Sequence, residues 1–432
     1  MEQREILDVI GVGVGPFNLG LAALLEKTDC TFMCFEQKSK FDWHPGMLLE
    51  GTTLQVPFMA DLVTMVDPTS PYSFLNYLHE HERLYQFYFF EKFQIPRNEY
   101  NHYCQWVADR LNSLQFNSEV KQIKAHTEGK TYFEVSVQQG DRITSYYSHH
   151  VVLGVGTKPV IPRDFQSLQS EQLYHSSQYK MNREKTLQAE SITVIGSGQS
   201  AAEIVFDLLQ QQNEKNYELS WYTRSKGFYP MEYSKLGLEH FSPDYTRYFY
   251  QLEHEKKQRV LKNQALLYKG ISFNTISDIY ELLYERTIGG EKCPITMRAL
   301  TELTEIEQTE DSQALTLYQY EQEVFQKTVS DVVIMATGYQ SSFPSFMNGM
   351  KDQLQFDEQC QLKIDEQYKV KTSIEGASLF VQNGELHTHG VGAPDLGLGA
   401  YRNAVIINQI AGKEVYKLSN RTVFQQFGLK EE

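Results

Sequence analysis

The stretch from Ile6 to Gly20 constrains the fold most, because it has the pattern of a buried strand, a tight turn and a helix start. An apolar run leads into Gly13 and Gly15, and Pro16 then opens a pattern of leucine and alanine that predicts a helix. Glycines at such a turn let the backbone approach a pyrophosphate, and the free N–H groups of the helix bind the anion. Asn18 replaces the third glycine of the usual G-x-G-x-x-G, so the spacing alone is a weak match.

An acidic residue after the next strand strengthens this interpretation. Glu36 closes the strand-like run 31–36, roughly 20 residues beyond the turn, where a carboxylate is placed to bind a ribose hydroxyl. The sequence therefore predicts a dinucleotide site, against the alternative of an ordinary strand, loop and helix.

The pattern returns at residues 191–209. A strand leads into Gly196 and Gly198, and the motif G-x-G-x-x-A is an accepted form of the dinucleotide fingerprint. The following strand ends in Arg224 and Lys226 rather than in an acid, and such cations suit the 2′-phosphate of NADPH. The alternative is that both cations belong to a solvated surface turn.

The composition limits the remaining classes. A chain of 432 residues exceeds the size of one core, so two or three domains are expected. The net charge of −15 disfavours nucleic acid and anionic membranes as partners and attracts cations. No apolar run is long enough for a membrane span, and the N-terminus lacks signal-peptide features. The five cysteines are scattered without a C-x-x-C, which favours reduced thiols in the cytoplasm.

The order of these motifs predicts an α/β fold with two Rossmann-like dinucleotide-binding domains, the second inserted into the first. The buried run Val151–Thr157 is followed by a proline pair that indicates a crossover, and Asp331–Tyr339 repeats its character. The expected domains are residues 1–165, the first part of the FAD-binding domain; residues 166–330, the NADPH-binding domain with a helical substrate-binding insert at about 228–290; and residues 331–432, the second part of the FAD-binding domain with a C-terminal segment for substrate and flavin.

Two such sites imply that NADPH delivers a hydride to a resident flavin. A reduced flavin passes electrons to a disulfide, to another protein or to oxygen, and the missing C-x-x-C argues against the first. We predict no metal site, because neither His387 with His389 nor Cys30 with Cys34 has convincing ligand spacing.

Six motifs follow one another between about residue 6 and residue 411: VGVGPFNLGLAAL, WHPGM from Trp43, the run Asp61–Leu78, GSGQSAAE, ATGY from Ala336 and THG from Thr388. In this order they resemble the N-hydroxylating flavoprotein monooxygenases, the family of the L-lysine and L-ornithine N-monooxygenases of siderophore synthesis. The resemblance implies FAD, NADPH and O₂ as reactants, retained NADP⁺, and a C4a-hydroperoxyflavin that hydroxylates a neutral primary amine. It also implies a homo-oligomer, a tetramer or a dimer.

The resemblance carries over to individual positions. FAD is expected at Gly13, Gly15, Pro16, Asn18 and Glu36, with Trp43, His44, Met47 and Gln55 around its ring system. NADPH is expected at Gly196, Gly198, Gln199, Ser200, Arg224 and Lys226. Thr337, Gly338 and Leu396 complete the expected cofactor-binding set. No side chain is expected to be a certain acid or base, because oxygen activation belongs to the flavin.

The chain departs from the amino-acid hydroxylases where those enzymes hold the substrate carboxylate. Ala60 stands in place of a lysine, Leu238 in place of an asparagine and Gly397 in place of a serine, while Asp395 lies two residues before Gly397. A substrate carboxylate would be unpaired and desolvated here, whereas a second ammonium would be paired by Asp395. The sequence therefore favours an aliphatic diamine, putrescine before cadaverine. The alternative is that Asp395 is a helix N-cap and Ala60 has no role.

Other functions remain open on the sequence. They are a lysine or ornithine N-monooxygenase that uses other cations, a histamine N-monooxygenase, and a class B monooxygenase, for which no F-x-G-x-x-x-H motif is found. The non-enzyme alternative, an FAD- and NADPH-binding redox sensor, would need degraded nucleotide motifs, and these look intact.

Overall fold

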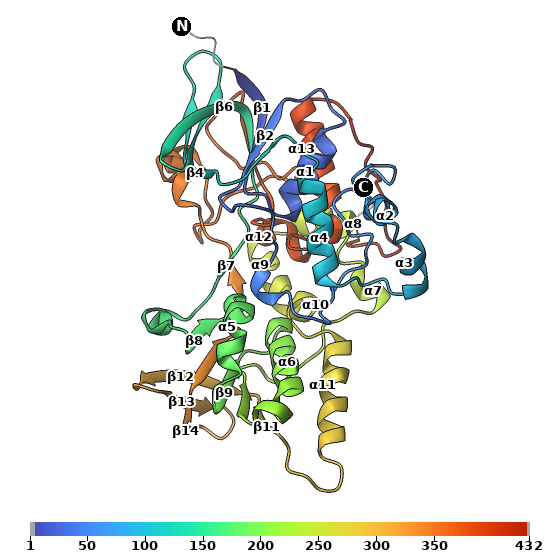
Figure 1. Cartoon of the computed structure of the whole chain (residues 1–432). Coiled ribbons are helices and arrows are strands. Elements are labelled where there is room, and N and C mark those ends of the chain that lie inside the picture. Colours follow the sequence, from blue (N-terminus) through green and yellow to red (C-terminus); the bar gives the residue numbers. More distant parts are fainter. Residues whose placement is uncertain (1–4, 430–432) are drawn as a thin grey trace.

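Two sheets, one in each half of the molecule, organise the computed structural model, which describes residues 5–429 (Figure 1). The larger sheet has the order β3-β2-β1-β6-β5-β4, and β17 also pairs with β6. β1, β2, β3, β6 and β17 run parallel, whereas β4 and β5 form an antiparallel extension. The strands are β1 (Ile6–Val12), β2 (Phe32–Phe35), β3 (Leu114–Gln115), β4 (Glu119–His126), β5 (Tyr132–Gln139), β6 (Arg142–Leu153) and β17 (Ser378–Val381).

Helices from both ends of the chain cover this sheet. α1 (Pro16–Leu25) is buried along its whole length, because its residues are nearly all apolar and it packs between neighbouring helices. These are α4 (Arg97–Ala108) and α13 (Gly399–Ala411). The C-terminal segment thus returns to the first domain, as the inserted topology predicted. The short helices α2 (Phe74–Glu80), α3 (Leu84–Phe90) and α12 (Leu386–His389) lie in the same half (Figure 1).

The second sheet is parallel throughout, in the order β11-β10-β9-β15-β8. α6 (Gln199–Lys215) follows its central strand and packs against α11 (Phe273–Arg286). The remaining bounds are β8 (Leu173–His175), β9 (Ser191–Ile195), β10 (Glu218–Tyr222), β11 (Ile295–Arg298), β15 (Val332–Met335) and α5 (Tyr179–Thr186). Both sheets are therefore Rossmann-like, and the predicted fold class is confirmed.

The boundary expected at residue 331 differs from the strand pairing. β15 pairs with β9 and β8 of the second sheet, so the chain returns to the first domain only after Met335. The sequence of a buried apolar strand before a glycine turn is compatible with either sheet. Only the strands that pair with it show to which sheet it belongs. The crossings are β7 (Lys158–Pro159) and β16 (Tyr339–Gln340), which pair antiparallel.

Smaller elements complete the second half. An antiparallel sheet of β12 (Thr301–Gln308), β13 (Gln313–Gln319) and β14 (Val324–Ser330) extends from it. The expected helical insert contains α7 (Lys235–Leu238), α8 (Pro243–Gln251), α9 (His254–Asn263) and α10 (Ala265–Tyr268), while α11 belongs with the second sheet. The 3₁₀ turns are η1 (Pro45–Met47), η2 (Arg163–Leu168), η3 (Ser176–Gln178), η4 (Ser345–Gln353), η5 (Gly390–Gly392) and η6 (Leu396–Leu398). Within the described residues, no helix is both long enough and apolar enough to cross a membrane.

A buried ion pair fixes the C-terminal segment against α13. The guanidinium Nη1 of Arg402 lies 2.9 Å from Glu385 Oε1, and both residues are almost wholly buried, at 1 % and 0 % exposure. Arg402 also donates a 2.7 Å hydrogen bond from Nη2 to the carbonyl of Ala393. The pair therefore sets the path of residues 385–393, which lead directly into the turn that carries Asp395.

Replacing Arg402 with methionine should lower the free energy of unfolding by about 3–5 kcal/mol, because Glu385 would be left as an unpaired buried charge. The double replacement Arg402→Met with Glu385→Leu should recover most of this loss. Urea denaturation followed by tryptophan fluorescence measures both. The control is Lys121→Met, whose exposed pair with Glu119 at 3.0 Å should be worth less than about 1 kcal/mol. Equal losses at the two sites would contradict the buried-pair account.

Candidate active site

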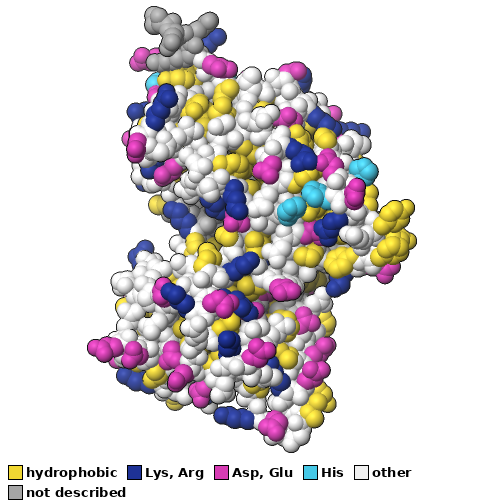
Figure 2. All heavy atoms as spheres, viewed as in Figure 1, with side chains coloured by type: hydrophobic (Ala, Val, Ile, Leu, Met, Phe, Trp, Pro, Cys, Tyr) yellow, Lys and Arg dark blue, Asp and Glu magenta, His cyan; other side chains and the backbone are white. Residues whose placement is uncertain are grey.

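A cavity of about 2250 Å³ lies between the two halves and is lined by both glycine turns. Residues of the first sheet, the second sheet, the crossing strands and the C-terminal segment all contribute to its wall. The space-filling view shows the molecule hollowed between its upper and lower halves (Figure 2). One continuous cavity therefore joins sites that the sequence predicts separately.

The first turn is built by close backbone packing. Gly13 has a φ of +84°, and a Cβ at this position would lie 2.7 Å from the carbonyl oxygen of Gly154 at the end of β6. Gly15 is different, since a Cβ there would have nothing within 4 Å. Gly15 also caps α1 without any side-chain hydrogen bond, and Gly15 and Pro16 line the cavity. The turn thus leaves room and free N–H groups where an anion can bind.

The second turn repeats this arrangement. Gly196 has a φ of +135°, and its Cβ would lie 2.3 Å from the carbonyl oxygen of Ala336 after β15. A Cβ on Gly198, the N-cap of α6, would again meet nothing within 4 Å. In both sheets one glycine is required by packing and the other leaves open space in the cavity.

Glu36 lines the cavity beside the first turn. Its Oε2 accepts a 2.8 Å hydrogen bond from the backbone N–H of Val14, and its Oε1 accepts one of 2.9 Å from the backbone N–H of Lys38. The carboxylate therefore holds the turn in shape from the position where a ribose hydroxyl was expected.

Asn18 does not line the cavity, although the sequence placed it at the FAD site. It is fully buried, and its Nδ2 donates hydrogen bonds to the carbonyls of Val12 and Gly13. Its Oδ1 accepts a 2.8 Å hydrogen bond from Gln382 Nε2. The side chain thus ties the turn to the C-terminal segment. The third position of the glycine motif can therefore have a structural role inside the protein. The sequence gives no signal for this role, because the partner Gln382 is 364 residues away.

The loop after β2 brings four expected residues to the cavity. Trp43, His44, Met47 and Gln55 all line it. His44 packs edge-on against Trp43 and Tyr339, with ring centroids 4.9 and 5.6 Å apart. Burial, with the charges of Arg97 and Lys38, lowers the pKa of His44 to about 4, so this imidazole is neutral at neutral pH. Gln55 Nε2 is buried and has no hydrogen-bond partner among the described residues.

The residues expected for the second nucleotide divide into two groups. Ser200 lines the cavity, and so does Arg224, which is highly exposed, with Nη1 3.6 Å from Glu302 Oε1. Gln199 also lines the cavity, but its amide bonds to protein groups, donating to Glu203 and Thr275. Lys226 is exposed and lies outside the lining, so the structure brings only one of the two predicted cations to the site.

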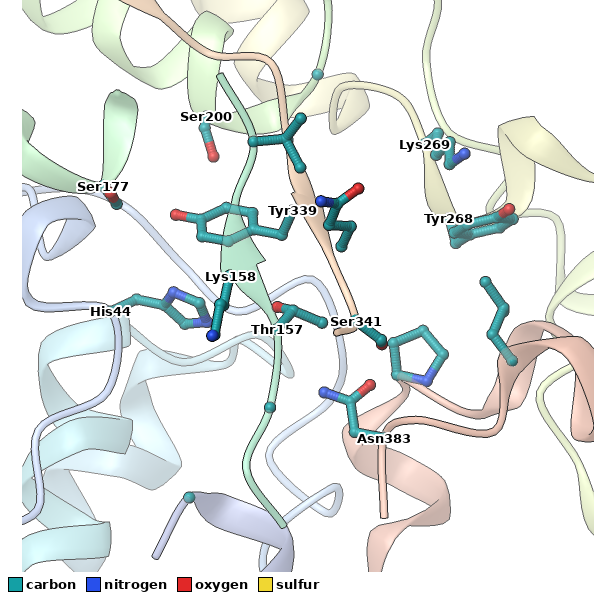
Figure 3. A pocket seen from close by; sticks show the side chains of 18 of the residues that line it. His44, Thr157, Lys158, Ser177, Ser200, Tyr268, Lys269, Tyr339, Ser341 and Asn383 are labelled. Atoms are coloured by element: carbon teal, nitrogen blue, oxygen red, sulfur yellow. The ribbon is translucent and has the colours of Figure 1, made fainter. Parts of the chain in front are cut away.

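Thr337 and Gly338 lie where the chain crosses between the domains, and both line the cavity. The Gly338 carbonyl accepts a 2.9 Å hydrogen bond from Val160 N–H and contacts His175 Nε2 at 3.0 Å. Figure 3 shows the two crossing strands side by side, with the Tyr339 ring beside His44. The crossing is therefore part of the wall of the site.

The positions expected to bind the far end of the substrate converge. A Cβ on Gly397 would lie 3.8 Å from that of Ala60 and 2.8 Å from Asp395 Oδ1, and all three residues line the cavity with Leu238 and Leu396. Asp395 is also the N-cap of η6, since its Oδ1 accepts a 2.8 Å hydrogen bond from Gly397 N–H. Burial raises the pKa of Asp395 to about 6.

Two further features of the wall were not found from the sequence. Tyr233 lines the cavity, and burial together with the charge of Asp395 raises its pKa to about 12, so its phenol is neutral near that carboxylate. Arg97 of α4 donates a 2.7 Å hydrogen bond to Glu203 of α6, which joins the two domains across the site. Glu203 is the last residue of the motif GSGQSAAE, and no neighbouring residue in the sequence indicates that its partner lies in the other domain.

Comparison with known proteins decides the family. A model described as L-lysine 6-monooxygenase/L-ornithine 5-monooxygenase matches residues 5–341. This chain belongs to that family. Among relatives of this monooxygenase, a putrescine N-hydroxylase of Shewanella oneidensis is 44 % identical over 98 % of the chain and 84 % of the relative.

Solved structures agree. An FAD-bound cadaverine monooxygenase of the desferrioxamine pathway from Erwinia amylovora has a TM-score of 0.95 and 41 % identity, covering 99 % of this chain and 100 % of that one. An ornithine N-hydroxylase of Kutzneria with reduced FAD, NADP⁺ and L-ornithine has a TM-score of 0.88 and 26 % identity over 94 % and 99 %. The family expected from the motifs is confirmed.

The two kinds of glycine should respond differently to the same added methyl group. Gly198→Ala should leave the free energy of unfolding almost unchanged but weaken NADP⁺ binding at least about tenfold, because the new Cβ projects where a pyrophosphate approaches the helix. Gly196→Ala should instead lower stability by more than about 1 kcal/mol, through its positive φ and the clash with Ala336. Fluorescence titration with NADP⁺ and urea denaturation measure the two effects. Loss of stability in Gly198→Ala with unchanged binding would contradict the assignment.

Proposed function

We propose that this chain is an FAD- and NADPH-dependent N-monooxygenase that uses O₂ to hydroxylate one amino group of a primary aliphatic diamine, putrescine first and cadaverine second, for hydroxamate siderophore biosynthesis. The observation that carries the substrate assignment is Asp395, a carboxylate in the cavity wall beside Ala60 and Gly397. The putrescine and cadaverine enzymes named above support it.

The wall around Asp395 suits an ammonium group. The methyl group of Ala60 and the neutral phenol of Tyr233 lie nearby. Arg402, whose charge also acts on Asp395, is already paired with Glu385, so the Asp395 carboxylate is available to a cation. Desolvation alone raises its pKa, and an ammonium in contact would lower it again, since an opposite charge favours the ionised form.

An amino-acid substrate fits this end poorly. Its carboxylate would face Asp395 as a like charge, with no lysine at position 60 to pair with it. Desolvating an unpaired carboxylate costs several kcal/mol, more than a single hydrogen bond restores. The same reasoning allows histamine, which also lacks a carboxylate, as a second candidate below the diamines.

The residues of the cavity fit the two cofactors. The open space at Gly15 and Gly198 admits two pyrophosphates, and the unpartnered Nε2 of Gln55 is available to a polar ring system beside Trp43 and His44. When bound, FAD supplies oxygen activation with electrons from NADPH. The chain holds the cofactors and the amine together, and the aromatic side chains around His44 help to exclude water. Neutral His44 adds no positive charge that would repel an approaching cationic substrate.

The preference for NADPH over NADH rests on Arg224. Its guanidinium is exposed at the rim of the cavity after β10, where a 2′-phosphate would lie, and the nearby Glu302 holds it only loosely at 3.6 Å. The cytoplasm is the proposed compartment, which agrees with five cysteines that are all free in the described chain.

Removing the Arg224 guanidinium should reduce the preference for NADPH over NADH by about 1.5–3 kcal/mol, the worth of a charge-assisted hydrogen bond. The measurement is kcat/KM for each coenzyme in wild type and Arg224→Ala. Lys226→Ala is the matched control, because Lys226 is an exposed cation two residues away that does not line the cavity. Equal use of both coenzymes by the wild type would overturn the role of Arg224.

Hydroxylated product measured against a panel of amines tests the substrate. Putrescine or cadaverine should be used at least about tenfold more efficiently than ornithine or lysine, since one mispaired end group costs more than roughly 1.4 kcal/mol. Asp395→Asn should raise KM for the diamine more than it lowers kcat, because the contact is the same in ground and transition states. Asparagine caps helices as well as aspartate does, so this variant removes the charge and keeps the turn.

The pH dependence of diamine turnover tests the same role of the Asp395 charge. Asp395 is charged above its pKa of about 6 and neutral below it, so diamine affinity should fall as the pH drops through 6. The ratio of wild-type to Asp395→Asn kcat/KM should therefore shrink toward one below that pH. Titration of the substrate amine affects both proteins equally and cancels in the ratio. A ratio independent of pH, or a preference for lysine over every diamine, would sink the assignment.

A further inference from the structure

A buried phenol oxygen in the cavity wall has no partner. Tyr339 lines the cavity at the domain crossing, and its Oη is buried without a hydrogen bond among the described residues. Burial raises the pKa of Tyr339, and this outweighs the opposite effects of nearby Ser177 and Arg97, so the phenol is protonated at neutral pH. It is therefore a hydrogen-bond donor, and a buried donor is unfavourable unless a ligand supplies the acceptor.

The ring of Tyr339 is held in place from two sides. It packs edge-on against His44 and His175, with ring centroids 5.6 and 5.1 Å away. His175 is itself fixed, because its Nε2 lies 3.0 Å from the carbonyl oxygen of Gly338. In Figure 3 the Tyr339 ring lies between His44 and Ser200, which belong to different domains. The phenol therefore has a set position where the loop after β2 and the start of α6 face the same cavity.

The strand order of the second sheet indicates which part of a coenzyme would lie beside this phenol. β9 ends at the turn of Gly196 and Gly198, with β10 on one side of it and β15 on the other. β10 ends before Arg224, where the 2′-phosphate of the adenosine half is proposed to bind, whereas β15 leads to Tyr339. A dinucleotide whose pyrophosphate lies at the central turn extends past the ends of the strands on both sides. Its nicotinamide half would then lie on the side of β15.

We propose that the Tyr339 hydroxyl donates a hydrogen bond to the carboxamide oxygen of the nicotinamide ring of NADP(H). This contact depends on the proposed coenzyme site at Gly198 and Arg224. The carboxamide is the polar group of the nicotinamide ring, and its oxygen is the acceptor that a neutral phenol requires. The bond fixes the rotation of the ring beside the loop of Trp43 and His44, where the flavin is proposed to bind, and so holds it in the orientation that hydride transfer requires.

The stability of the protein separates this role from a structural one. Without coenzyme the Tyr339 hydroxyl bonds to nothing in the described chain, so Tyr339→Phe should not lower the free energy of unfolding. The ring contacts with His44 and His175 remain in this variant. The cost of the lost hydroxyl should therefore appear only when the coenzyme binds.

Calorimetric titration of the FAD-loaded enzyme tests the proposal with two probes that differ only in the nicotinamide. They are NADP⁺ and 2′-phospho-ADP-ribose, which keeps the 2′-phosphate, the pyrophosphate and both riboses. Tyr339→Phe should weaken NADP⁺ binding at least about fivefold and leave the affinity for 2′-phospho-ADP-ribose unchanged, because only NADP⁺ carries the acceptor. The matched control is Tyr284→Phe, which removes the same hydroxyl from a ring that is 67 % exposed on α11 and should change neither affinity.

An analogue of NADP⁺ with an acetyl group in place of the carboxamide identifies the atom that is bound. It keeps the carbonyl oxygen and lacks the amide N–H groups, so Tyr339→Phe should weaken its binding by the same factor as for NADP⁺. The rate of flavin reduction at saturating NADPH, measured without oxygen, should also fall in Tyr339→Phe, because the ring is no longer held.

Four outcomes overturn the proposal. They are an unchanged NADP⁺ affinity in Tyr339→Phe, an equal loss for both probes, a loss that disappears with the acetyl analogue, and a lower free energy of unfolding without coenzyme. Arg224→Ala distinguishes these from a failure of the coenzyme site, since it should weaken both probes through their shared 2′-phosphate. If Arg224→Ala changes neither affinity, the coenzyme site and the Tyr339 contact are both wrong. If it weakens both while Tyr339→Phe weakens neither, only the Tyr339 contact is wrong.

Discussion

The site depends on one contact made twice, the close packing of a glycine turn against the backbone of a neighbouring strand end. Gly13 meets the carbonyl of Gly154, and Gly196 meets that of Ala336. No side chain fits at Gly13 or Gly196, so each turn packs directly against the backbone of its sheet. The helix that follows each turn therefore begins beside the cavity. The open positions at Gly15 and Gly198, where the two nucleotides are proposed to bind, follow from this packing.

The fold and the outline of the site could be predicted because the decisive features are local. Short apolar patterns in the sequence indicate both glycine turns, the strands around them and the helix at 400–410. What could not be predicted depends on partners that are distant in sequence. Three features depend on segments that only the folded chain brings together. They are the pairing of β15 with β9, the hydrogen bond between Asn18 and Gln382, and the ion pair between Arg97 and Glu203.

Asp395 is the proposed ligand of the substrate and is also the cap of a helical turn, and the two roles are compatible. One carboxylate oxygen accepts the Gly397 N–H and so fixes the turn η6, and this same bond holds the side chain in the cavity wall. The buried pair of Arg402 and Glu385 directs the chain leading into that turn. The proposed anchor thus has its own support, and a flexible diamine would meet a charge whose position is already set.

The antiparallel pairing of β7 with β16 has a consequence for how such proteins can be rearranged. The inserted domain leaves and re-enters at neighbouring points, so its two ends are joined to the rest of the chain within one short ladder. A domain whose two ends are adjacent can be exchanged between related proteins at two chain junctions, provided that the recipient has the same pair of antiparallel strands. An exchange of this kind would carry the insert with Tyr233 and Leu238 along with the coenzyme half, so both would be inherited as one unit.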